Sequence, residues 1–392
     1  MSMEPVRVGV VGMGVRGHWL AHLARTGAVT RLVAVADLDK QMLDLARRTF
    51  PGVQAYASGE EMAREADIEA VVVVTGDRFH AGNVEEALRH GKHVLVEKPL
   101  AQSFADLGRI ARLQRQSGLI VGTFLELRHS VLWQRVKAIL DAGEIGRVHA
   151  VSLVDLVGRD RAQFFGRRRG RSRDMMVSLV LQKGVHCLDL MNWFVGSSPR
   201  RLAAVGKLAH FGGDEPADKR CRDCQSKDTC PYFHGHTYEL NPPGISVDHG
   251  DDHCVWSAAC DLEDVSFVTL EYDDGTLGSY HEVHFAPHYG THFTLYGSKA
   301  QLDVEANHDT NECWVQVTQR HTHAVRRERP SEDTGHGGAD PQLLADFAGA
   351  VRAGREPLSG LRAGYESAQI GIATRLSIDS GRFVDLPRLE DE

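Results

Sequence analysis

The chain has 392 residues, of which 42% are hydrophobic and 25% charged, a composition that is typical of globular proteins and excludes a fibrous or disordered class. Its length suits two domains, and its net charge of −8 argues against a general nucleic-acid binder, which needs a basic surface. Because no apolar stretch approaches the roughly 20 residues of a membrane span and residues 1–9 show no leader pattern, we expect a soluble, cytoplasmic protein that binds no membrane.

The first third of the chain alternates short apolar runs with helical patterns. Such an alternation is typical of a parallel sheet whose two faces are both covered by helices. We therefore predict a doubly wound Rossmann domain with a parallel sheet over residues 1–124. Its expected strands are 6–11, 32–36, 70–75, 93–96 and 120–123, and its expected helices are one that ends near 26, then 41–49, 81–90 and 106–116.

Residues 125–392 predict a second domain of the α+β class. Polar and apolar residues alternate in several runs, and the turn Asp273-Asp274-Gly275 joins two of them, so we expect a largely antiparallel, open sheet that serves substrate binding and oligomerisation. The expected strands are 149–156, 266–272, 277–285, 292–296 and 301–304, and the expected helices are 128–142, 179–194, 341–353 and 361–380.

Gly12, Gly14 and Gly17 form the pattern G-x-G-x-x-G directly after the first expected strand and at the start of a helix. Gly12 permits a tight turn, Gly14 lets the backbone approach a pyrophosphate, and Gly17 lets the helix pack on the strand. The N-terminus of the helix attracts the phosphates. We predict that this turn, with the intervening Met13 and Val15, binds a dinucleotide.

Asp37 closes the second expected strand at about 20 residues from the glycine turn, the spacing that ribose recognition requires. Its carboxylate can accept hydrogen bonds from both ribose hydroxyls of NAD and would repel the 2′-phosphate of NADP. Leu38 and Asp39 follow without an arginine, so NAD is favoured over NADP. Two alternatives stay open: Asp37 as a turn residue, and Arg16 or Lys40 as a partner for a phosphate.

Glu97-Lys98-Pro99 follows the strand expected at 93–96. With this motif the chain resembles the glucose-fructose oxidoreductase / inositol dehydrogenase / MocA family, whose members carry Glu-Lys-Pro after this strand. The resemblance extends over nearly the whole chain, because further matching pieces follow in order. These pieces are Thr75 with His80, Gly143-Glu144-Ile145-Gly146, His186-x-x-Asp189, the segment from His336 to Pro341, and the helix after Pro357.

The resemblance implies a two-domain enzyme that transfers hydride between nicotinamide C4 and a carbinol carbon. It also implies that Lys98 lies at the substrate hydroxyl, and that Thr75, His80 and Glu97 lie with Lys98 beside the cofactor. Removing hydride from a carbinol requires that the hydroxyl proton leave, so the site needs a base within hydrogen-bond reach and a cation that favours the alkoxide. Lys98 suits the cation and His186 suits the base.

The helix that carries His186 departs from the family pattern. Many relatives read Asp-x-Gly-x-His, whereas this chain reads Gln182-Lys183-Gly184-Val185-His186. An amide can hold a hydroxyl but cannot take its proton, so His186 acts as the base alone or with help from Lys183. The alternative is that His186 is a buried structural histidine bonded to Asp189.

The predicted substrate pocket takes side chains from several segments. We expect the substrate to be bound by Lys98, Arg128, Gln182, Lys183, His186 and His284. An arginine run ahead of the catalytic helix is either a solvated loop or, if it folds over the pocket, a site for an acidic sugar, a sugar phosphate or a nucleotide-linked sugar. It comprises Arg167, Arg168, Arg169, Arg171 and Arg173.

Cys221, Cys224 and Cys230 lie closer together in the sequence than packing alone explains, and tetrahedral zinc needs a fourth ligand. Cys254 is the best candidate, because a similar cysteine cluster followed by a Cys-Val-aromatic piece occurs in one branch of the family. This predicts a structural zinc that clips a loop at 215–256. Free thiols or one local disulfide are the alternatives, and other possible fourth ligands are His234, His236 and His253.

These features favour an NAD-dependent dehydrogenase that acts on a secondary hydroxyl of a sugar, glycoside or cyclitol. One alternative is a cyclic redox reaction, an epimerase or lyase type of sugar chemistry that regenerates NAD. Another is a non-catalytic dinucleotide sensor. The missing acid at Gln182 favours the sensor, whereas the presence of Lys98 and His186 argues against it. The open sheet predicts a homodimer or homotetramer.

Overall fold

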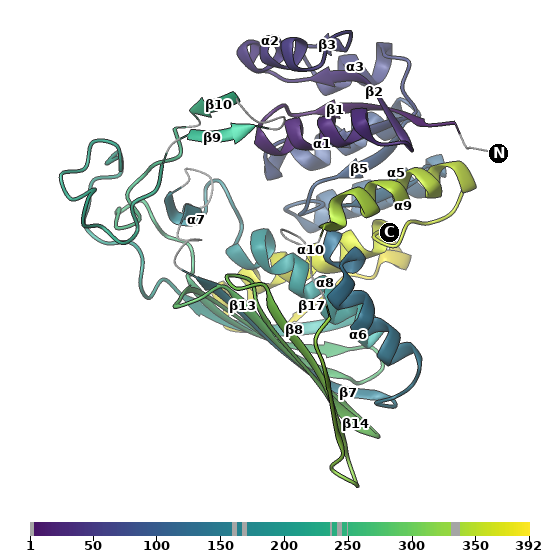
Figure 1. The fold of residues 1–392 in the computed structure, drawn as a ribbon, viewed down its shortest axis with the longest axis vertical. Helices are drawn as coiled ribbons and strands as arrows, with labels where there is room; N and C mark the ends of the chain where they lie inside the picture. The colour runs from purple at the N-terminus through teal and green to yellow at the C-terminus, as the bar shows by residue number, and fades with distance from the viewer. Residues whose placement is uncertain are drawn as a thin grey trace.

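The computed structural model describes residues 4–158, 163–166, 171–235, 237–240, 245–248, 250–330 and 338–392. These residues form two large sheets and one small hairpin. In Figure 1 the sheet of the first third of the chain lies above the larger sheet of the remainder. The predicted class, a parallel Rossmann sheet followed by an α+β part with a mostly antiparallel sheet, is confirmed.

The first sheet is parallel and has six strands in the order β3-β2-β1-β4-β5-β6. The strand order reverses between β1 and β4. Doubly wound sheets bind ligands in the crevice at the carboxyl ends of the strands beside such a reversal. The strands are β1 (Val6–Val11), β2 (Thr30–Ala36), β3 (Gln54–Tyr56), β4 (Ala70–Val73), β5 (His93–Val96) and β6 (Val121–Thr123).

Helices cover both faces of this sheet, because alternate residues of each strand point to opposite sides. In β4, Val71 and Val73 pack into one core, whereas Ala70 and Val72 pack into the other. The strands are therefore apolar at successive positions, as the sequence pattern indicates. The helices between them are α1 (Val15–Thr26), α2 (Lys40–Thr49), α3 (Gly59–Glu65), α4 (His80–Arg89) and α5 (Phe104–Ser117).

The second sheet has nine strands in the order β16-β15-β14-β13-β7-β12-β11-β8-β17. Its described pairs are antiparallel except for β7 with β12. One face is covered by α6 (Val131–Asp141), α8 (Val185–Val195) and α10 (Leu361–Ser380) (Figure 1). The strands are β7 (Val148–Gly158), β8 (Pro199–Lys207), β11 (Val265–Tyr272), β12 (Leu277–Ala286), β13 (Gly290–Gly297), β14 (Ala300–Asn307), β15 (Glu312–Gln319), β16 (Val325–Glu328) and β17 (Val384–Asp385).

The C-terminal helices return to the first sheet. Leu343 and Phe347 of α9 (Ala339–Ala353) pack into the core on one face of that sheet. Tyr365 and Ala368 of α10 pack into the core on its other face. Because α10 also packs on the second sheet, it contributes to the cores of both sheets.

The segment between β8 and β11, residues 208–264, forms what we call the cysteine loop, and it includes the predicted zinc loop 215–256. It carries the hairpin of β9 (Thr237–Leu240) and β10 (Ile245–Asp248), and β9 lies beside α1 (Figure 1). A small core joins the loop to the segment that precedes α8; it includes Phe165, Met176, Leu179, Phe211, Val255 and Leu262. The cysteine loop therefore packs against the segment that leads into the predicted catalytic helix.

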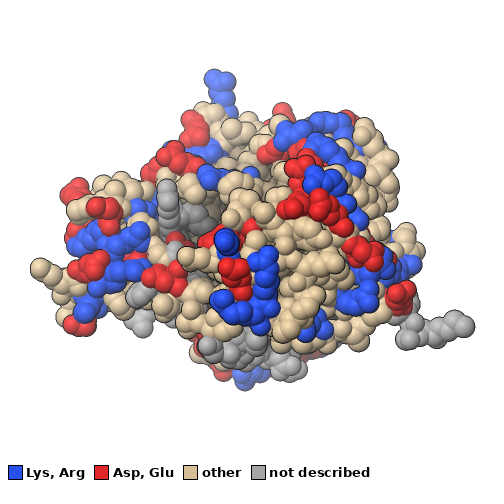
Figure 2. All heavy atoms as spheres, turned by 90° about the horizontal axis from the view of Figure 1, so that it is seen from above, with Lys and Arg blue, Asp and Glu red and all other residues tan. Residues whose placement is uncertain are grey.

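Among the described residues, every helix is too short or too polar to span a membrane. Lys and Arg side chains are interspersed with Asp and Glu side chains over the face shown in Figure 2. This mixed surface agrees with the modest net charge of −8.

Candidate functional site

The glycine turn joins β1 to α1 at the carboxyl edge of the first sheet, and Val15 is the first residue of α1. Gly12 has φ 94°, in the left-handed region that favours glycine. A Cβ on Gly17 would lie 1.8 Å from the Gly12 carbonyl oxygen, whereas a Cβ on Gly14 would meet nothing within 4 Å. Gly17 thus lets α1 pack against the turn, and Gly14 faces open space beside the helix N-terminus. That space fits a pyrophosphate.

Asp37 lies directly after β2 and contacts the glycine turn. Its Oδ2 accepts a hydrogen bond from Met13 N at 2.6 Å, and its Oδ1 accepts one from Asp39 N at 2.8 Å. The Met13 side chain is buried, so of Met13 only the backbone could make the predicted contact with the cofactor. These bonds hold the Asp37 carboxylate where a ribose lies when a pyrophosphate occupies the turn.

Arg16 belongs to an ion-pair network that joins α1 to α9. Its Nε lies 2.7 Å from Glu97 Oε1, and its two terminal nitrogens donate to both carboxylate oxygens of Asp340. This arrangement does not fit the alternative in which Arg16 binds a phosphate of NADP. Glu97 also accepts a hydrogen bond from Lys98 N, so its contacts hold the turn after β5. Lys40, exposed at the start of α2, is the remaining alternative for a phosphate.

His80 is buried and bridges the loops that follow β4 and β5. Its Nδ1 lies 2.7 Å from the Pro99 carbonyl oxygen, and its Nε2 lies 3.0 Å from the Thr75 carbonyl oxygen. Both ring nitrogens thus contact the backbone, and the expected contact of His80 with the cofactor is replaced by a structural one. The Thr75 hydroxyl oxygen is buried without a hydrogen-bond partner among the described residues, so it is able to bond a ligand.

Lys98 reaches the predicted catalytic helix, where its Nζ donates a hydrogen bond to the Gln182 carbonyl oxygen at 2.7 Å. Residues Val180–Gly184 form a π-helical turn that continues into α8. The sequence pattern predicts one continuous α-helix here, and the structure differs by this wider turn. Such turns are frequent at functional sites. The structure thus brings Lys98 to the turn that carries Lys183 and leads to His186.

Lys183 is held as a cation. Its Nζ lies 2.6 Å from Asp155 Oδ2 and 5.4 Å from the centre of the Tyr289 ring. Burial lowers the pKa of Lys183, but the charge of Asp155 and its hydrogen bond, together with Tyr289 and Cys187, outweigh burial, and the pKa lies well above its ordinary value. The expectation that Lys183 helps to take the hydroxyl proton does not fit this ion pair, because a lysine that stays protonated cannot accept a proton.

Behind Lys183 a chain of buried polar side chains runs through the second sheet. The Tyr280 hydroxyl lies 3.2 Å from Asp155 Oδ2 and 2.5 Å from Glu282 Oε2, and His284 contacts the other oxygen of Glu282. His284 is buried against Phe164 and Phe165, so the prediction that it faces the substrate pocket is replaced by a structural role.

The sequence motifs did not indicate Asp155, Tyr280 and Glu282. All three occupy inward-facing positions of β7 or β12, strands in which buried and more exposed residues alternate. An acidic residue at an inward-facing position of such a strand must be paired. That signal is present in the sequence.

His186 faces Glu126 of the short helix η2 (Glu126–His129), and its Nδ1 lies 3.6 Å from Glu126 Oε1. The alternative in which His186 bonds Asp189 is not what the structure shows. Asp189 instead binds Arg128, whose Nε and Nη2 lie 2.8 and 2.7 Å from its carboxylate oxygens. Arg128 also donates to the Leu358 carbonyl oxygen, so its contacts are structural and differ from the expected substrate contact.

Comparison with known proteins identifies the family. Residues 6–124 match the Gfo/Idh/MocA model described as an oxidoreductase family with an NAD-binding Rossmann fold, and residues 137–386 match its C-terminal alpha/beta domain. The chain belongs to this oxidoreductase family. The resemblance noted from Glu97-Lys98-Pro99 and the enzyme class that it implies are therefore confirmed.

Similar proteins include YteT of Bacillus subtilis, 26% identical over 91% of this chain and 92% of YteT. Inositol 2-dehydrogenase of Burkholderia multivorans is 31% identical, but the match covers 49% of this chain and 55% of that protein. Two solved structures share the fold. An oxidoreductase domain protein of Kribbella flavida has a TM-score of 0.77 at 17% identity, covering 98% of this chain and 100% of that one. The WlbA dehydrogenase of Bordetella pertussis, in complex with NADH and UDP-GlcNAcA, has a TM-score of 0.70 at 18% identity and the same coverage.

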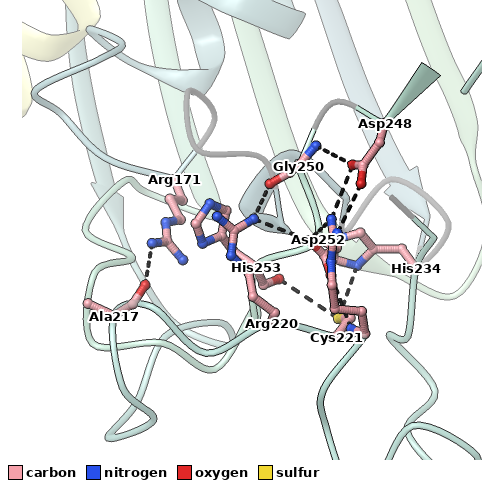
Figure 3. A network of polar contacts seen from close by, with 10 residues as sticks. Arg171, Ala217, Arg220, Cys221, His234, Asp248, Gly250, Asp252 and His253 are labelled. Carbon is pink, nitrogen blue, oxygen red and sulfur yellow. Dashed lines mark hydrogen bonds and ion pairs between the residues drawn. The ribbon is translucent and has the colours of Figure 1, made fainter. Parts of the chain in front are cut away.

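In this Gfo/Idh/MocA oxidoreductase the described arginines of the predicted run hold the cysteine loop. Arg171 donates to the Ala217 carbonyl oxygen at 2.6 Å (Figure 3), and Arg173 lies 2.8 Å from Glu263 Oε1. These contacts agree with a structural role rather than with an anion site over the pocket. Arg167, Arg168 and Arg169 lie outside the described residues.

The four predicted zinc ligands, Cys221, Cys224, Cys230 and Cys254, line one pocket of about 280 Å³ in the cysteine loop. Among the described residues the structure contains no disulfide, so the alternative of one local disulfide is not what it shows. Cys221 Sγ lies 3.8 Å from His234 Nδ1 (Figure 3), whereas His236 lies outside the described residues. Among the residues that the structure describes, three potential ligand atoms come within 4.8 Å of one another only at Glu60, Glu86 and His90. The thiols therefore share a pocket without forming a closed coordination sphere.

Proposed function

We propose that this chain is an NAD-dependent dehydrogenase that acts on a secondary hydroxyl of a sugar, glycoside or cyclitol. The observation that carries the proposal is the hydrogen bond from Lys98 Nζ to the Gln182 carbonyl oxygen, because it joins the dinucleotide-binding sheet to the turn before His186. One relative is named for inositol, a cyclitol, and one structural neighbour holds NADH with a nucleotide-linked sugar, which supports this substrate class.

In the proposed reaction the substrate hydroxyl lies between Lys98 and His186. Lys98 donates a hydrogen bond to the hydroxyl oxygen and stabilises the forming alkoxide. His186 accepts the hydroxyl proton, and the carbon that bears this hydroxyl releases its hydride, so the carbinol becomes a ketone. The nicotinamide ring supplies the hydride acceptor when NAD is bound. Lys183, fixed by Asp155, and the Gln182 amide donate to neighbouring substrate oxygens.

The proposal is tested by turnover of NAD⁺ with a panel of cyclitols, neutral sugars and uronic acids. We expect NADH absorbance to rise in step with a ketone product. An epimerised or cleaved sugar without net NADH would replace this proposal by the cyclic redox alternative. NAD binding without turnover of any compound would favour the sensor.

We further propose that the enzyme prefers NAD to NADP. Replacing Asp37 by alanine removes charge-assisted hydrogen bonds to the ribose, so we expect NAD⁺ to bind about 10- to 100-fold more weakly. Binding of NADP⁺ should not weaken, because the carboxylate that repels the 2′-phosphate is gone. Calorimetric titration with both cofactors measures this. The control is Asp39→Ala, since Asp39 caps α2. Equal affinity of wild type and Asp37→Ala for NAD⁺ would contradict the assignment.

We propose that the cysteine loop binds a structural zinc. The four thiols line one pocket, which supports this proposal, and zinc binding requires that their sulfurs move together around the ion. We expect one zinc per chain when the protein is purified without chelators and analysed by mass spectrometry. Cys224→Ser with Cys230→Ser should remove the metal, and Cys313→Ser, a buried thiol of β15, should retain it. A folded wild-type protein without metal refutes the zinc.

The face of the second sheet opposite α6, α8 and α10, which no helix of the described residues covers, supports a homodimer or homotetramer. Exposed apolar side chains lie on it from four strands: Val205, Phe267, Leu277 and Tyr296. Such a patch on an open sheet is typical of an interface. We propose that two copies pair through this face.

A further inference from the structure

Glu126 and His186 form a buried pair between two elements that are far apart in the sequence. The carboxylate lies in η2, directly after the first sheet, and the imidazole lies in the first turn of α8. The His186 side chain is 12% exposed and the Glu126 side chain 2%, so water screens the pair only weakly. At 3.6 Å the pair is longer than a hydrogen bond, as catalytic contacts often are before substrate binds.

A second pair braces the same two elements. Arg128, two residues after Glu126, binds both carboxylate oxygens of Asp189, three residues after His186. A bidentate pair of this kind fixes direction as well as distance. Because η2 is held on α8 in this way, Glu126 is held opposite His186.

The charged groups around His186 are otherwise paired with one another. Asp155 faces Lys183 in the preceding turn, and Asp189 faces Arg128 in the following one. Lys98 donates to the backbone of the π turn. The positive charge of Arg16 is paired with Glu97 and Asp340 and also acts on Glu126. Among the described contacts, Glu126 is thus the carboxylate that serves His186.

We propose that Glu126 is the positioning residue for His186 and supplies the carboxylate that the helix lacks at Gln182. This rests on the proposed function, in which His186 takes the hydroxyl proton. With Nδ1 turned to Glu126, the substrate proton goes to Nε2, and a bound nicotinamide would accept the hydride of the carbinol carbon. Glu126 stabilises the imidazolium that forms and itself stays deprotonated.

The test is Glu126→Gln, which keeps shape and removes charge. Loss of the carboxylate favours neutral His186, so we expect its imidazole to titrate about 1 pH unit or more lower in nuclear magnetic resonance spectra of ¹³C-histidine-labelled protein. The signal is assigned by its loss in His186→Asn. The acid limb of kcat/KM should move to lower pH by the same amount, because the base is active when deprotonated. At neutral pH kcat should fall about 10- to 100-fold with KM little changed, as for a group that acts in the transition state.

Two further variants separate positioning from folding. Glu126→Asp retains the charge and should restore most of the His186 titration, even where its shorter reach lowers kcat. Glu85→Gln removes another buried carboxylate, one that pairs with Arg89 and Arg109 in the first domain, and it should leave His186 unchanged. The same His186 titration in wild type and Glu126→Gln overturns the inference. A wild-type protein without dehydrogenase activity overturns instead the proposed function, and with it the catalytic role of the pair.

Discussion

Replacing Lys98 by alanine is expected to lower kcat by about 10²- to 10³-fold while leaving NAD binding close to that of the wild type. Lys98 Nζ contacts the Gln182 carbonyl oxygen, at the turn where the substrate hydroxyl is proposed to lie. Its charge matters most when the alkoxide forms, so its loss raises the barrier more than it weakens binding of the ground state. Steady-state kinetics on the best substrate and NAD⁺ titration by calorimetry measure the two effects.

The matched control is Lys92→Ala. Lys92 lies just before β5, at the end opposite Lys98, and its Nζ donates to the Ile68 carbonyl oxygen at 2.9 Å. It has the same kind of backbone contact but lies far from the carboxyl edge, so kcat should stay within about twofold of the wild type. If both variants lost activity equally, the cause would be stability. If Lys98→Ala remained fully active, Lys98 would have no catalytic role.

The fold follows from sequence periods wherever burial is regular. Apolar runs and the 3.6-residue pattern located every Rossmann strand except β3, and the helix Leu361–Ser380, to within a few residues. The pattern did not predict β3, β8, β9, β10, β15, β16 or β17. Of these, β3, β16 and β17 are short strands at sheet edges, which bury little apolar surface and so carry a weak signal. The π turn Val180–Gly184 was missed because one inserted residue in a turn leaves the apolar periodicity of a helix nearly intact.

The candidate site was predicted less completely than the fold, for a reason that Arg128 and His80 illustrate. Each has the chemistry of a ligand-binding group, but its partner comes from a distant segment: Asp189 for Arg128, and Pro99 with Thr75 for His80. Sequence spacing does not show such partners. The glycine turn differs because its function depends on local backbone geometry, which Gly12 and Gly17 determine directly.

Replacing Asp155 by asparagine is expected to destabilise the protein by about 3–5 kcal/mol, because it leaves the Lys183 ammonium buried without its counter-charge. Asp155 is fully buried and also accepts hydrogen bonds from the Tyr280 hydroxyl and the Cys187 thiol, so solvent cannot replace it. The shift of the urea unfolding midpoint, at unchanged slope, measures the loss. A loss below about 1 kcal/mol would show that Lys183 does not need the carboxylate.

The double variant Asp155→Leu with Lys183→Met decides what the pair is for. Breaking a buried ion pair is costly, but replacing both members by apolar groups is often neutral, so the double variant should recover most of the stability lost in Asp155→Asn. If the pair exists to present a cation to the substrate, the recovered protein will still bind NAD⁺ but show a raised KM for the polyol. If stability returns together with an unchanged KM, Lys183 serves only the fold, and substrate contact in this region falls to Lys98 and Gln182.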